Sequence, residues 1–216
     1  MTSTDTSFWD KSAQKYSQSP IADQAGYERT LAATRAHLRP TDTVTELGCG
    51  TGGTAISLGR SVKYYLATDI SPGMISIANT TQSNTADAPS GLEFRVATAD
   101  SLAAEQPGKF NAVLAFNYLH LVRDLAGTLK SVNTLLAPGG LFISKTGCVR
   151  DMRFGMLLGP ALPVLRVVGL APFVNNFDAG ELKAEFQKAG FEIVAEEYHG
   201  SGKGDARPFI VAKKVA

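Results

Sequence analysis

The chain has 216 residues, of which 44% are hydrophobic and 19% are charged. This composition is typical of a single folded domain and unlike that of disordered chains. Lysine and arginine together number 21, and aspartate and glutamate 20, so the summed charge provides no positive field that would hold a polyanion. We therefore expect no nucleic-acid partner.

The two cysteines, Cys49 and Cys148, stand singly. Their spacing fits neither a zinc site nor a disulfide-rich scaffold, which predicts a reducing, cytoplasmic location and no metal site. The first twenty residues lack the basic stretch and apolar core of a secretory signal, so we expect no export. The sequence does not indicate the oligomeric state.

Two helices are predicted before the main fold. The apolar residues at helical spacing in the first, amphipathic helix are Phe8, Trp9, Ala13 and Tyr16. The second helix is expected over Gln24 to Leu38, because Pro40 disfavours helix in the residue before it. We expect residues 1–40 to form a helical cover across the domain.

Apolar, strand-like runs then alternate with helix-like stretches, which predicts an α/β fold with a parallel sheet covered by helices. The five runs are Val44–Leu47, Tyr64–Thr68, Phe94–Ala97, Ala112–Phe116 and Leu141–Ser144. After Asp178, an N-cap, a helix should close on Gly190. The stretches FEIVAEEYHG and RPFIVAKK then predict two strands joined by a short loop. We expect seven strands, mostly parallel, with a C-terminal antiparallel hairpin.

One segment, Phe154 to Val174, is apolar but contains three prolines and Arg166. A bilayer crossing needs about 20 residues of unbroken apolar helix, so this segment does not predict a membrane span. It is interpreted as a substrate lid, with a core helix or transient contact with a membrane surface as alternatives. The residues expected to form its apolar pocket are Met152, Met156, Leu157, Leu158 and Leu165.

The strongest motif is VTELGCGTGGTA, in which a short strand leads through a glycine-rich loop into a helix. Gly48, Gly50 and Gly53 let a ligand approach main-chain N–H groups beside a helix N-terminus. Their spacing also satisfies the dinucleotide pattern, so the glycines alone leave a nicotinamide cofactor and S-adenosylmethionine both open.

Three acidic residues follow the first three strands and favour S-adenosylmethionine. Glu46 would repel a pyrophosphate but would favour an ammonium and a sulfonium. Asp69, about 20 residues after the glycines, suits ribose hydroxyls in either cofactor. Asp100 follows the third strand, where it could accept a hydrogen bond from an adenine amino group, and no dinucleotide pattern requires it.

With these residues in place, the sequence resembles the class I, Rossmann-like S-adenosylmethionine-dependent methyltransferases. The resemblance covers Val44 to Ser144 and rests on five motifs in order, which are ELGCGTG, ATDISPGM, ATADSL, FNAVLAFNYLHL and LLAPGGLFIS. It implies a single domain with a cover over residues 1–40, a cofactor-binding core over 41–146, an insertion over 147–177 and a helix with hairpin over 178–216.

The resemblance also implies which residues contact the cofactor. Glu46 and the loop residues Gly48, Cys49 and Gly50 would flank the methionine part. Asp69 would bind ribose, Asp100 would bind adenine, and Ile70 and Ala99 would sandwich the adenine ring. Tyr16, from the helical cover, and Asn117, after the fourth strand, would contact the methionine end.

Each assignment has a structural alternative. Glu46 could be a charge at a strand end that meets solvent, and Asp69 and Asp100 could be helix N-caps. Tyr16 could serve packing alone.

The acceptor side is less defined. His120, after the fourth strand, is the candidate general base, with hydrogen bonding within its loop as the alternative. Lys145, Cys148 and His199 could also face the pocket. We expect methyl transfer to a small, apolar or aromatic acceptor; the alternatives are an NAD(P)-dependent oxidoreductase and a non-catalytic cofactor-binding subunit.

Overall fold

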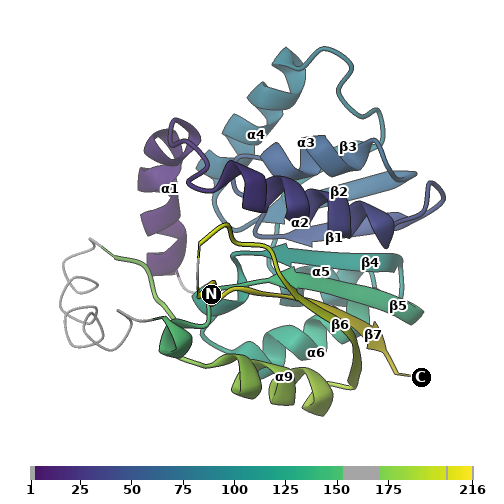
Figure 1. Ribbon diagram of the computed structural model, residues 1–216. Coiled ribbons are helices and arrows are strands. Elements are labelled where there is room, and N and C mark those ends of the chain that lie inside the picture. Colours follow the sequence, from purple (N-terminus) through teal and green to yellow (C-terminus); the bar gives the residue numbers. More distant parts are fainter. Residues whose placement is uncertain (1–2, 153–170, 203, 216) are drawn as a thin grey trace.

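A seven-stranded sheet with the order β3-β2-β1-β4-β5-β7-β6 forms the centre of the protein (Figure 1). The structure is a computed structural model that describes residues 3–152, 171–202 and 204–215. Strands β1 to β5 pair in parallel, whereas β7 is antiparallel to both β5 and β6. The predicted mixed sheet with its C-terminal hairpin is confirmed.

The strands begin or end within a few residues of the predicted positions, except that β5 begins five residues earlier. Their bounds are β1 Thr43–Leu47, β2 Tyr64–Asp69, β3 Leu92–Val96, β4 Phe110–Phe116, β5 Leu136–Lys145, β6 Phe191–Tyr198 and β7 Pro208–Lys214. The early part of β5 contains the turn-like sequence APGG with Pro138, and its pairing with β4 shifts register between Phe110 and Ala112. A turn signal in the sequence therefore masked part of a strand.

Helices cover both faces of the sheet. Their bounds are α1 Ser3–Ser17, α2 Gln24–Ala36, α3 Gly53–Gly59, α4 Pro72–Asn84, α5 Ala99–Glu105, α6 Leu125–Leu135 and α9 Ala179–Lys188, with short 3-10 turns η1 Leu119–Leu121 and η2 Val149–Asp151. The predicted second helix ends two residues before Leu38, at Ala36, with His37 as its C-cap. Asp178 is the N-cap of α9 as predicted, and it forms a capping box with Glu181.

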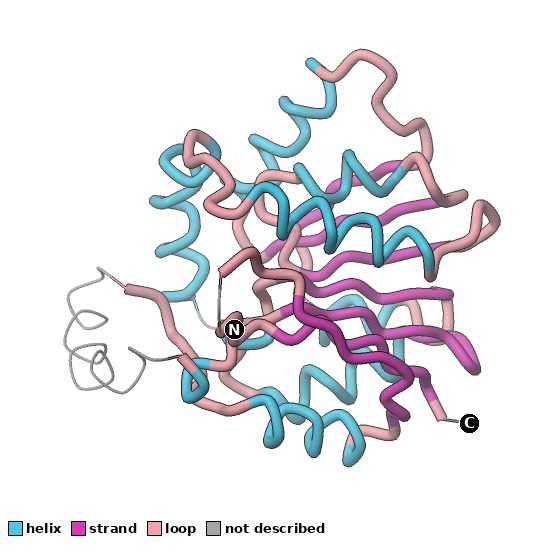
Figure 2. Tube along the Cα trace, viewed as in Figure 1, coloured by secondary structure: helices cyan, strands magenta, loops and turns pink. Residues whose placement is uncertain are grey.

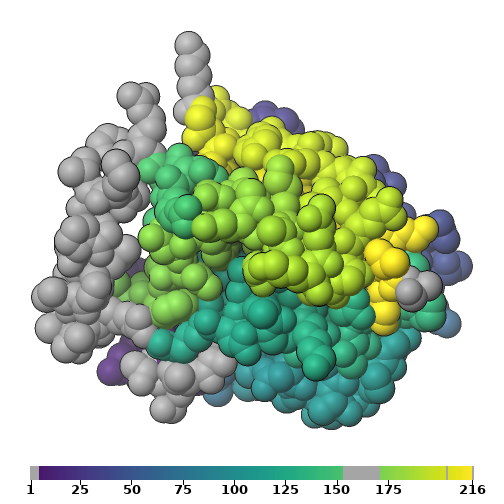
Figure 3. All heavy atoms as spheres, turned by 90° about the horizontal axis from the view of Figure 1, so that it is seen from below, coloured from purple at the N-terminus to yellow at the C-terminus, as the bar shows by residue number. Residues whose placement is uncertain are grey.

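Two apolar cores lie on opposite faces of the sheet. Leu102, Val132 and Phe186 bring α5, α6 and α9 against one face. On the other face, Leu31 of α2 and Leu58 of α3 pack against the sheet, together with α4. Figure 3 shows the first face from outside, with the α9 and β6 region in yellow-green beside the teal region of α5 and α6. Burial on both faces fixes the sheet, and with it the loops at the strand ends.

Helix α1 lies beside the edge at which the parallel strands end, as Figures 1 and 2 show. It packs against α4, and Asp10 accepts hydrogen bonds from the Ser71 hydroxyl and from the backbone N–H of Gly73 at 2.9 Å. Near its start, Asp5 receives two hydrogen bonds from Arg123, at 2.7 and 2.8 Å. The predicted N-terminal helix is confirmed, and its position over the strand ends makes it a cover.

The apolar segment predicted over Phe154 to Val174 lies largely outside the described residues, and so do Met156, Leu157, Leu158 and Leu165. Met152 is described and is 38% exposed. Among the described helices, none is long and apolar enough to cross a membrane. The choice between lid, core and membrane-surface helix stays a prediction, as do the boundaries between the parts of the domain.

Candidate cofactor and substrate site

A cavity of about 240 Å³ opens at the carboxyl ends of the parallel strands, under α1. This is the edge where ligands bind in open α/β sheets, and the size is near the lower end of small-molecule sites. The lining residues are Trp9, Tyr16, Leu47, Gly48, Gly50, Thr68, Asp69, Ile70, Met74, Ala97, Ala99, Phe116, Asn117, Tyr118, His120, Leu121 and Pro172. Among these described residues Asp69 is the sole carboxylate, and neither lysine nor arginine is present.

The loop between β1 and α3 strongly favours glycine at two of its positions. Gly48 has a φ of +71°, and a β-carbon there would lie 2.5 Å from Cδ2 of Tyr118. Gly52 has a φ of +85°, and a β-carbon there would lie 2.6 Å from Cζ of Phe94. Side chains would therefore meet both an unfavourable backbone conformation and a steric clash. The loop backbone stays open on the cavity side, where Gly48 and Gly50 form part of the wall.

Asp69 joins the glycine loop to the start of α4. Its Oδ2 accepts a hydrogen bond from the N–H of Gly50 at 3.0 Å, and its Oδ1 accepts one from the N–H of Ser71 at 2.9 Å. Burial raises the pKa of its carboxyl group, while these backbone hydrogen bonds oppose the rise. Asp69 thus places a negative charge in the wall of the cavity, in a fixed orientation.

Glu46 lies behind the glycine loop rather than at the surface. Its side chain is 2% exposed, and the hydroxyl of Tyr65 donates a hydrogen bond to its Oε2 at 2.8 Å. Burial raises the pKa of Glu46 to about 7, against the effect of this hydrogen bond, and the charge of nearby Asp69 adds to the rise. The alternative of a solvent-exposed charge is wrong, and any effect of Glu46 on a ligand acts through the loop.

The N-cap alternatives for the two aspartates are also wrong. Ser71 caps α4, and Thr98 caps α5 in a capping box with Ser101.

Ile70 and Ala99, which were expected to sandwich the adenine ring, both line the cavity. Asp100 lies in the first turn of α5, is exposed and does not line the cavity. The adenine contact of Asp100 stays a prediction, as do the cofactor contacts assigned to the other residues.

Cys49 is buried within the glycine loop, and its side chain does not line the cavity. Its backbone N–H donates to the carbonyl of Thr68 at 2.9 Å, which ties the loop to β2. Burial raises the pKa of its thiol. Cys49 therefore supports the loop through its backbone and does not present a reactive sulfur.

The β4 end of the cavity presents neutral polar groups. Asn117 has a φ of +52°, a left-handed conformation that asparagine tolerates better than most residues. Its backbone N–H donates to the carbonyl of Lys145 at 2.7 Å, which joins the ends of β4 and β5. His120 lies on η1, and its Nδ1 is 2.7 Å from Oγ1 of Thr146. Burial lowers the pKa of His120 to about 4, so the imidazole is neutral at pH 7.

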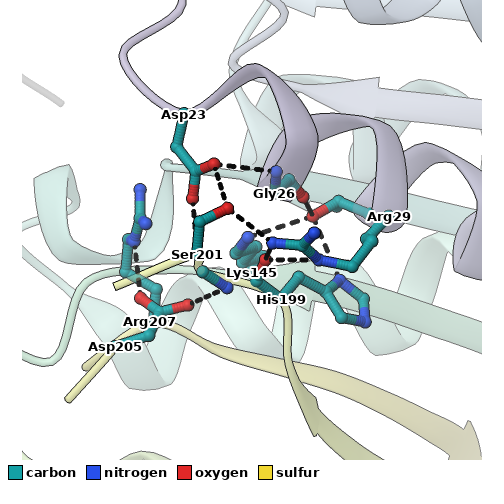
Figure 4. A network of polar contacts seen from close by, with 10 residues as sticks. Asp23, Gly26, Arg29, Lys145, His199, Ser201, Asp205 and Arg207 are labelled. Carbon is teal, nitrogen blue, oxygen red and sulfur yellow. Dashed lines mark hydrogen bonds and ion pairs between the residues drawn. The ribbon is translucent and has the colours of Figure 1, made fainter. Parts of the chain in front are cut away.

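Lys145 and His199 do not line the cavity, contrary to what the sequence suggested. They belong to a network that joins α2 to the segment between β6 and β7 (Figure 4). Lys145 Nζ donates to Oγ1 of Thr30 at 3.0 Å, and Arg29 donates to the carbonyl of His199 at 2.7 and 2.9 Å. Burial lowers the pKa of Lys145. The network attaches the N-terminal cover to the C-terminal hairpin.

Cys148 does not line the cavity either. Its backbone N–H donates to the carbonyl of Ala206 at 2.8 Å, and its side chain is fully buried. Burial raises the pKa of the thiol to about 12, so Cys148 is an inert core residue.

Some residues of the site were not predicted from the sequence. Trp9 lines the cavity but was identified only as part of an amphipathic helix, and Thr146, which bonds to His120 from behind the cavity, was not identified at all. Helical spacing does reveal that Trp9 and Tyr16 share a helix face. Nothing local marks Thr146, because its partner His120 lies 26 residues earlier in the chain.

Comparison with known proteins gives a consistent result. The family described as "Methyltransferase domain" matches residues 21–196. A ubiquinone biosynthesis O-methyltransferase of Xanthomonas euvesicatoria pv. vesicatoria is 26% identical over 152 residues, which cover 69% of this chain and 62% of that protein. A polyketide synthase-nonribosomal peptide synthetase of Aspergillus clavatus is 33% identical over 141 residues, which cover 62% of this chain and 3% of that protein. The chain thus spans less than two thirds of the length of these curated relatives.

Comparison with solved structures shows the same fold. The crystal structure of an S-adenosylmethionine-dependent methyltransferase from Thermotoga maritima matches with a TM-score of 0.71 and 20% identity, and covers 96% of this chain and 99% of that chain. The family match over most of the chain decides against the nicotinamide oxidoreductase that the glycine spacing had left open. The chain belongs to the S-adenosylmethionine-dependent methyltransferases, whose methyl donor is S-adenosylmethionine.

Proposed function

We propose that the protein transfers a methyl group from S-adenosylmethionine to a small, mostly apolar acceptor by in-line displacement. The observation that carries this proposal is the composition of the cavity wall. One carboxylate, Asp69, stands among aromatic and aliphatic side chains, and the described lining contains no lysine or arginine. Such a wall favours a cationic cofactor and an acceptor of low polarity.

The residues fit the cofactor on both charge and space. Asp69 creates a negative potential that favours the ammonium and sulfonium groups, and Glu46, behind the loop, adds to this potential only when it is deprotonated, above its pKa of about 7. Gly48 and Gly50 leave room for a ligand against the main chain. Tyr16 contributes to the wall from α1, and burial raises the pKa of its hydroxyl, which stays a neutral donor. When bound, S-adenosylmethionine supplies an activated methyl group.

The acceptor would lie toward the β4 side, where the wall is aromatic and aliphatic. Phe116, Leu121 and Pro172 provide apolar surface there. A phosphate or carboxylate on the acceptor would find no lysine or arginine within the described lining. One of the relatives is named for O-methylation, which supports an oxygen acceptor of this kind.

The reaction itself requires mainly alignment. Holding the nucleophile, methyl carbon and sulfur in line can lower the barrier by roughly 7 to 11 kcal/mol in favourable cases. The rigid loop around Gly48 and the cover formed by α1 are suited to hold both molecules in place. The cytoplasmic location, the exclusion of nucleic acid and the transient membrane contact remain predictions.

A transfer assay tests the proposal. The protein is incubated with S-adenosylmethionine carrying a labelled methyl group and with pools of phenols, amines, thiols and enols, and released S-adenosylhomocysteine is measured. We expect release above background with at least one pool of neutral, aromatic molecules. Binding of S-adenosylmethionine without release for any pool would support the non-catalytic subunit instead. Failure to bind S-adenosylmethionine would overturn the proposal altogether.

A further inference from the structure

His120 is held at three points beside the cavity. Its backbone N–H donates to Oγ1 of Thr146 at 3.2 Å, and its Nδ1 lies 2.7 Å from the same oxygen. Its carbonyl accepts a hydrogen bond from the N–H of Asn175 at 2.6 Å. Two of these bonds hold the backbone of η1, and the third turns Nδ1 toward the fully buried Thr146, in a side chain that lines the cavity.

The hydrogen-bond count at Thr146 determines which ring nitrogen carries the proton. The hydroxyl oxygen of Thr146 accepts the backbone N–H of His120, and its single hydrogen needs an acceptor of its own. Within the described part of the chain, Nδ1 of His120 is the sole atom that can take it. If Nδ1 were the donor, the hydroxyl hydrogen of a fully buried side chain would stay unpaired, which is costly. A neutral imidazole must then carry its proton on Nε2.

We propose that His120 presents an Nε2–H donor to the cavity, and that the methyl acceptor carries an acidic hydroxyl, a phenol or an enol, which binds as its oxyanion. This inference rests on the proposed function and names the class of acceptor. It replaces the role of general base, because the nitrogen that faces the cavity already holds a proton. Thr146 is a positioning residue that sets the tautomer of His120.

The charges around the cavity agree with this assignment. Burial keeps the imidazole neutral at pH 7, so His120 adds no positive charge that would repel the sulfonium. Within the described lining there is no lysine or arginine that could hold an oxyanion, so a neutral donor such as the imidazole N–H has to stabilise it. A hydrogen bond to a charged oxygen is stronger than one between neutral groups.

The transfer step then needs no base within the protein. The acceptor loses its hydroxyl proton to solvent before or during binding, and the Nε2–H stabilises the resulting oxyanion. In the transfer, a lone pair of the nucleophile forms the new bond to the methyl carbon. The electron pair of the broken carbon–sulfur bond returns to sulfur, which becomes a neutral thioether. For an enol, the negative charge of the oxyanion is shared with the carbon at the far end of the carbon–carbon double bond, and when that carbon takes the methyl group the carbon–oxygen bond becomes a carbonyl.

The tautomer can be observed directly by nitrogen-15 NMR of the protein saturated with S-adenosylhomocysteine and labelled at histidine. The chain has three histidines, and loss of a signal in His120→Gln assigns the ring of interest. At neutral pH we expect a protonated Nε2 and an unprotonated Nδ1. Thr146→Ser keeps the hydroxyl and should keep this pattern, whereas Thr146→Val should give a measurable share of the Nδ1–H form. A proton on Nδ1 in the wild type would overturn the proposal, and an unchanged Thr146→Val would remove Thr146 from it.

The acceptor class is tested with 4-nitrophenol, whose anion absorbs visible light, added to the same complex. His120→Ala should raise the dissociation constant of the anion about tenfold, the effect of removing a hydrogen bond to a charged group. His120→Gln, whose amide N–H can stand near the place of Nε2, should stay close to the wild type, and His120→Asn should resemble His120→Ala. Equal affinity for all four proteins, or no binding of the anion to the wild type, would overturn the oxyanion class.

The test also separates this inference from the proposed function. Glutamine cannot act as a base, so methyl transfer that survives in His120→Gln but falls in His120→Ala supports a donor. Methyl transfer that is lost equally in both variants, with S-adenosylhomocysteine still bound, supports a base and overturns the donor. Loss of S-adenosylhomocysteine binding by the wild type would count against the proposed function, whatever the tautomer.

In the transfer assay, the product distinguishes a phenol acceptor from an enol acceptor. Methylation at oxygen identifies a phenol-type acceptor, and methylation at carbon identifies an enol-type acceptor. Transfer exclusively to amines or thiols would contradict the inference.

Discussion

The protein around the cavity carries different kinds of polar group on its two sides. At the ends of β1 and β2 stand the carboxyl groups of Glu46 and Asp69, both with pKa values raised by burial. At the ends of β4 and β5 stand neutral groups, His120 and Thr146, joined by a hydrogen bond. The difference suggests that one side is built for a cationic cofactor and the other for an acceptor that must not be repelled by it. Four changes to the chain test this comparison.

The largest effect is expected from Gly48→Ala. A methyl group there meets Tyr118 at 2.5 Å and a φ of +71°, which together should lower the free energy of unfolding by about 3 kcal/mol. Gly53→Ala is the matched control, because nothing lies within 4 Å of its β-carbon. Urea denaturation measures both. Similar losses of unfolding free energy for the two variants would contradict the close contact between the Gly48 backbone and Tyr118.

Glu46 should make stability depend on pH. Its folded pKa of about 7 lies above the ordinary value of 4.5, so the folded protein keeps a proton that the unfolded chain loses. The stabilising contribution is therefore complete below about pH 4.5 and is lost as the pH rises toward 7. The stability of the wild type relative to Glu46→Gln should fall over this range by at least about 2 kcal/mol. Urea denaturation at several pH values measures the difference, and a flat difference would contradict the burial of an ionisable Glu46.

Asp69→Ala should weaken the binding of S-adenosylmethionine about tenfold or more, because it removes a charged hydrogen-bond acceptor from the cavity wall. Asp87→Asn is the control, since Asp87 is exposed, does not line the cavity and has a φ of +57° that asparagine tolerates. Calorimetric titration gives both dissociation constants. An unchanged constant for Asp69→Ala would remove the carboxylate side from cofactor binding.

The smallest effect is expected from Asp5→Asn, which weakens the link between α1 and Arg123. The side chain of Asp5 is 8% exposed, so the loss should be about 1 kcal/mol, at the upper end for ion pairs near a surface. Binding of S-adenosylmethionine should weaken severalfold, because Trp9 and Tyr16 of α1 line the cavity. Glu105→Gln alters a more exposed pair with Arg95 and should leave both thermal melting and binding nearly unchanged.

The residues on the β1 and β2 side of the cavity were largely predictable from the sequence because they lie close together in the chain. A strand, a glycine loop and a helix occupy Thr43 to Gly59, and Asp69 ends the next strand. The same local patterns predicted the sheet. The sequence could not show that Glu46 is buried, because the local sequence around a carboxylate next to a glycine loop is the same whether its side chain is buried or exposed.

The acceptor side depends on contacts between distant parts of the chain. His120 was identified by its place after the fourth strand, but its ring bonds to Thr146 and its backbone carbonyl accepts a hydrogen bond from Asn175, both distant in the chain. Lys145 shows the opposite error. It ends β5 at the correct edge, yet its side chain lies on the α2 face and bonds to Thr30. Position along a strand alone does not tell which face a side chain occupies at the strand's end.

The central claim is that the carboxylate side of the cavity binds a cationic adenosyl cofactor. Calorimetric titration of the wild-type protein with S-adenosylmethionine and, separately, with NAD tests it most directly. The account predicts heat of binding with one S-adenosylmethionine per chain and none with NAD. Heat with NAD alone, or with neither compound, would contradict it.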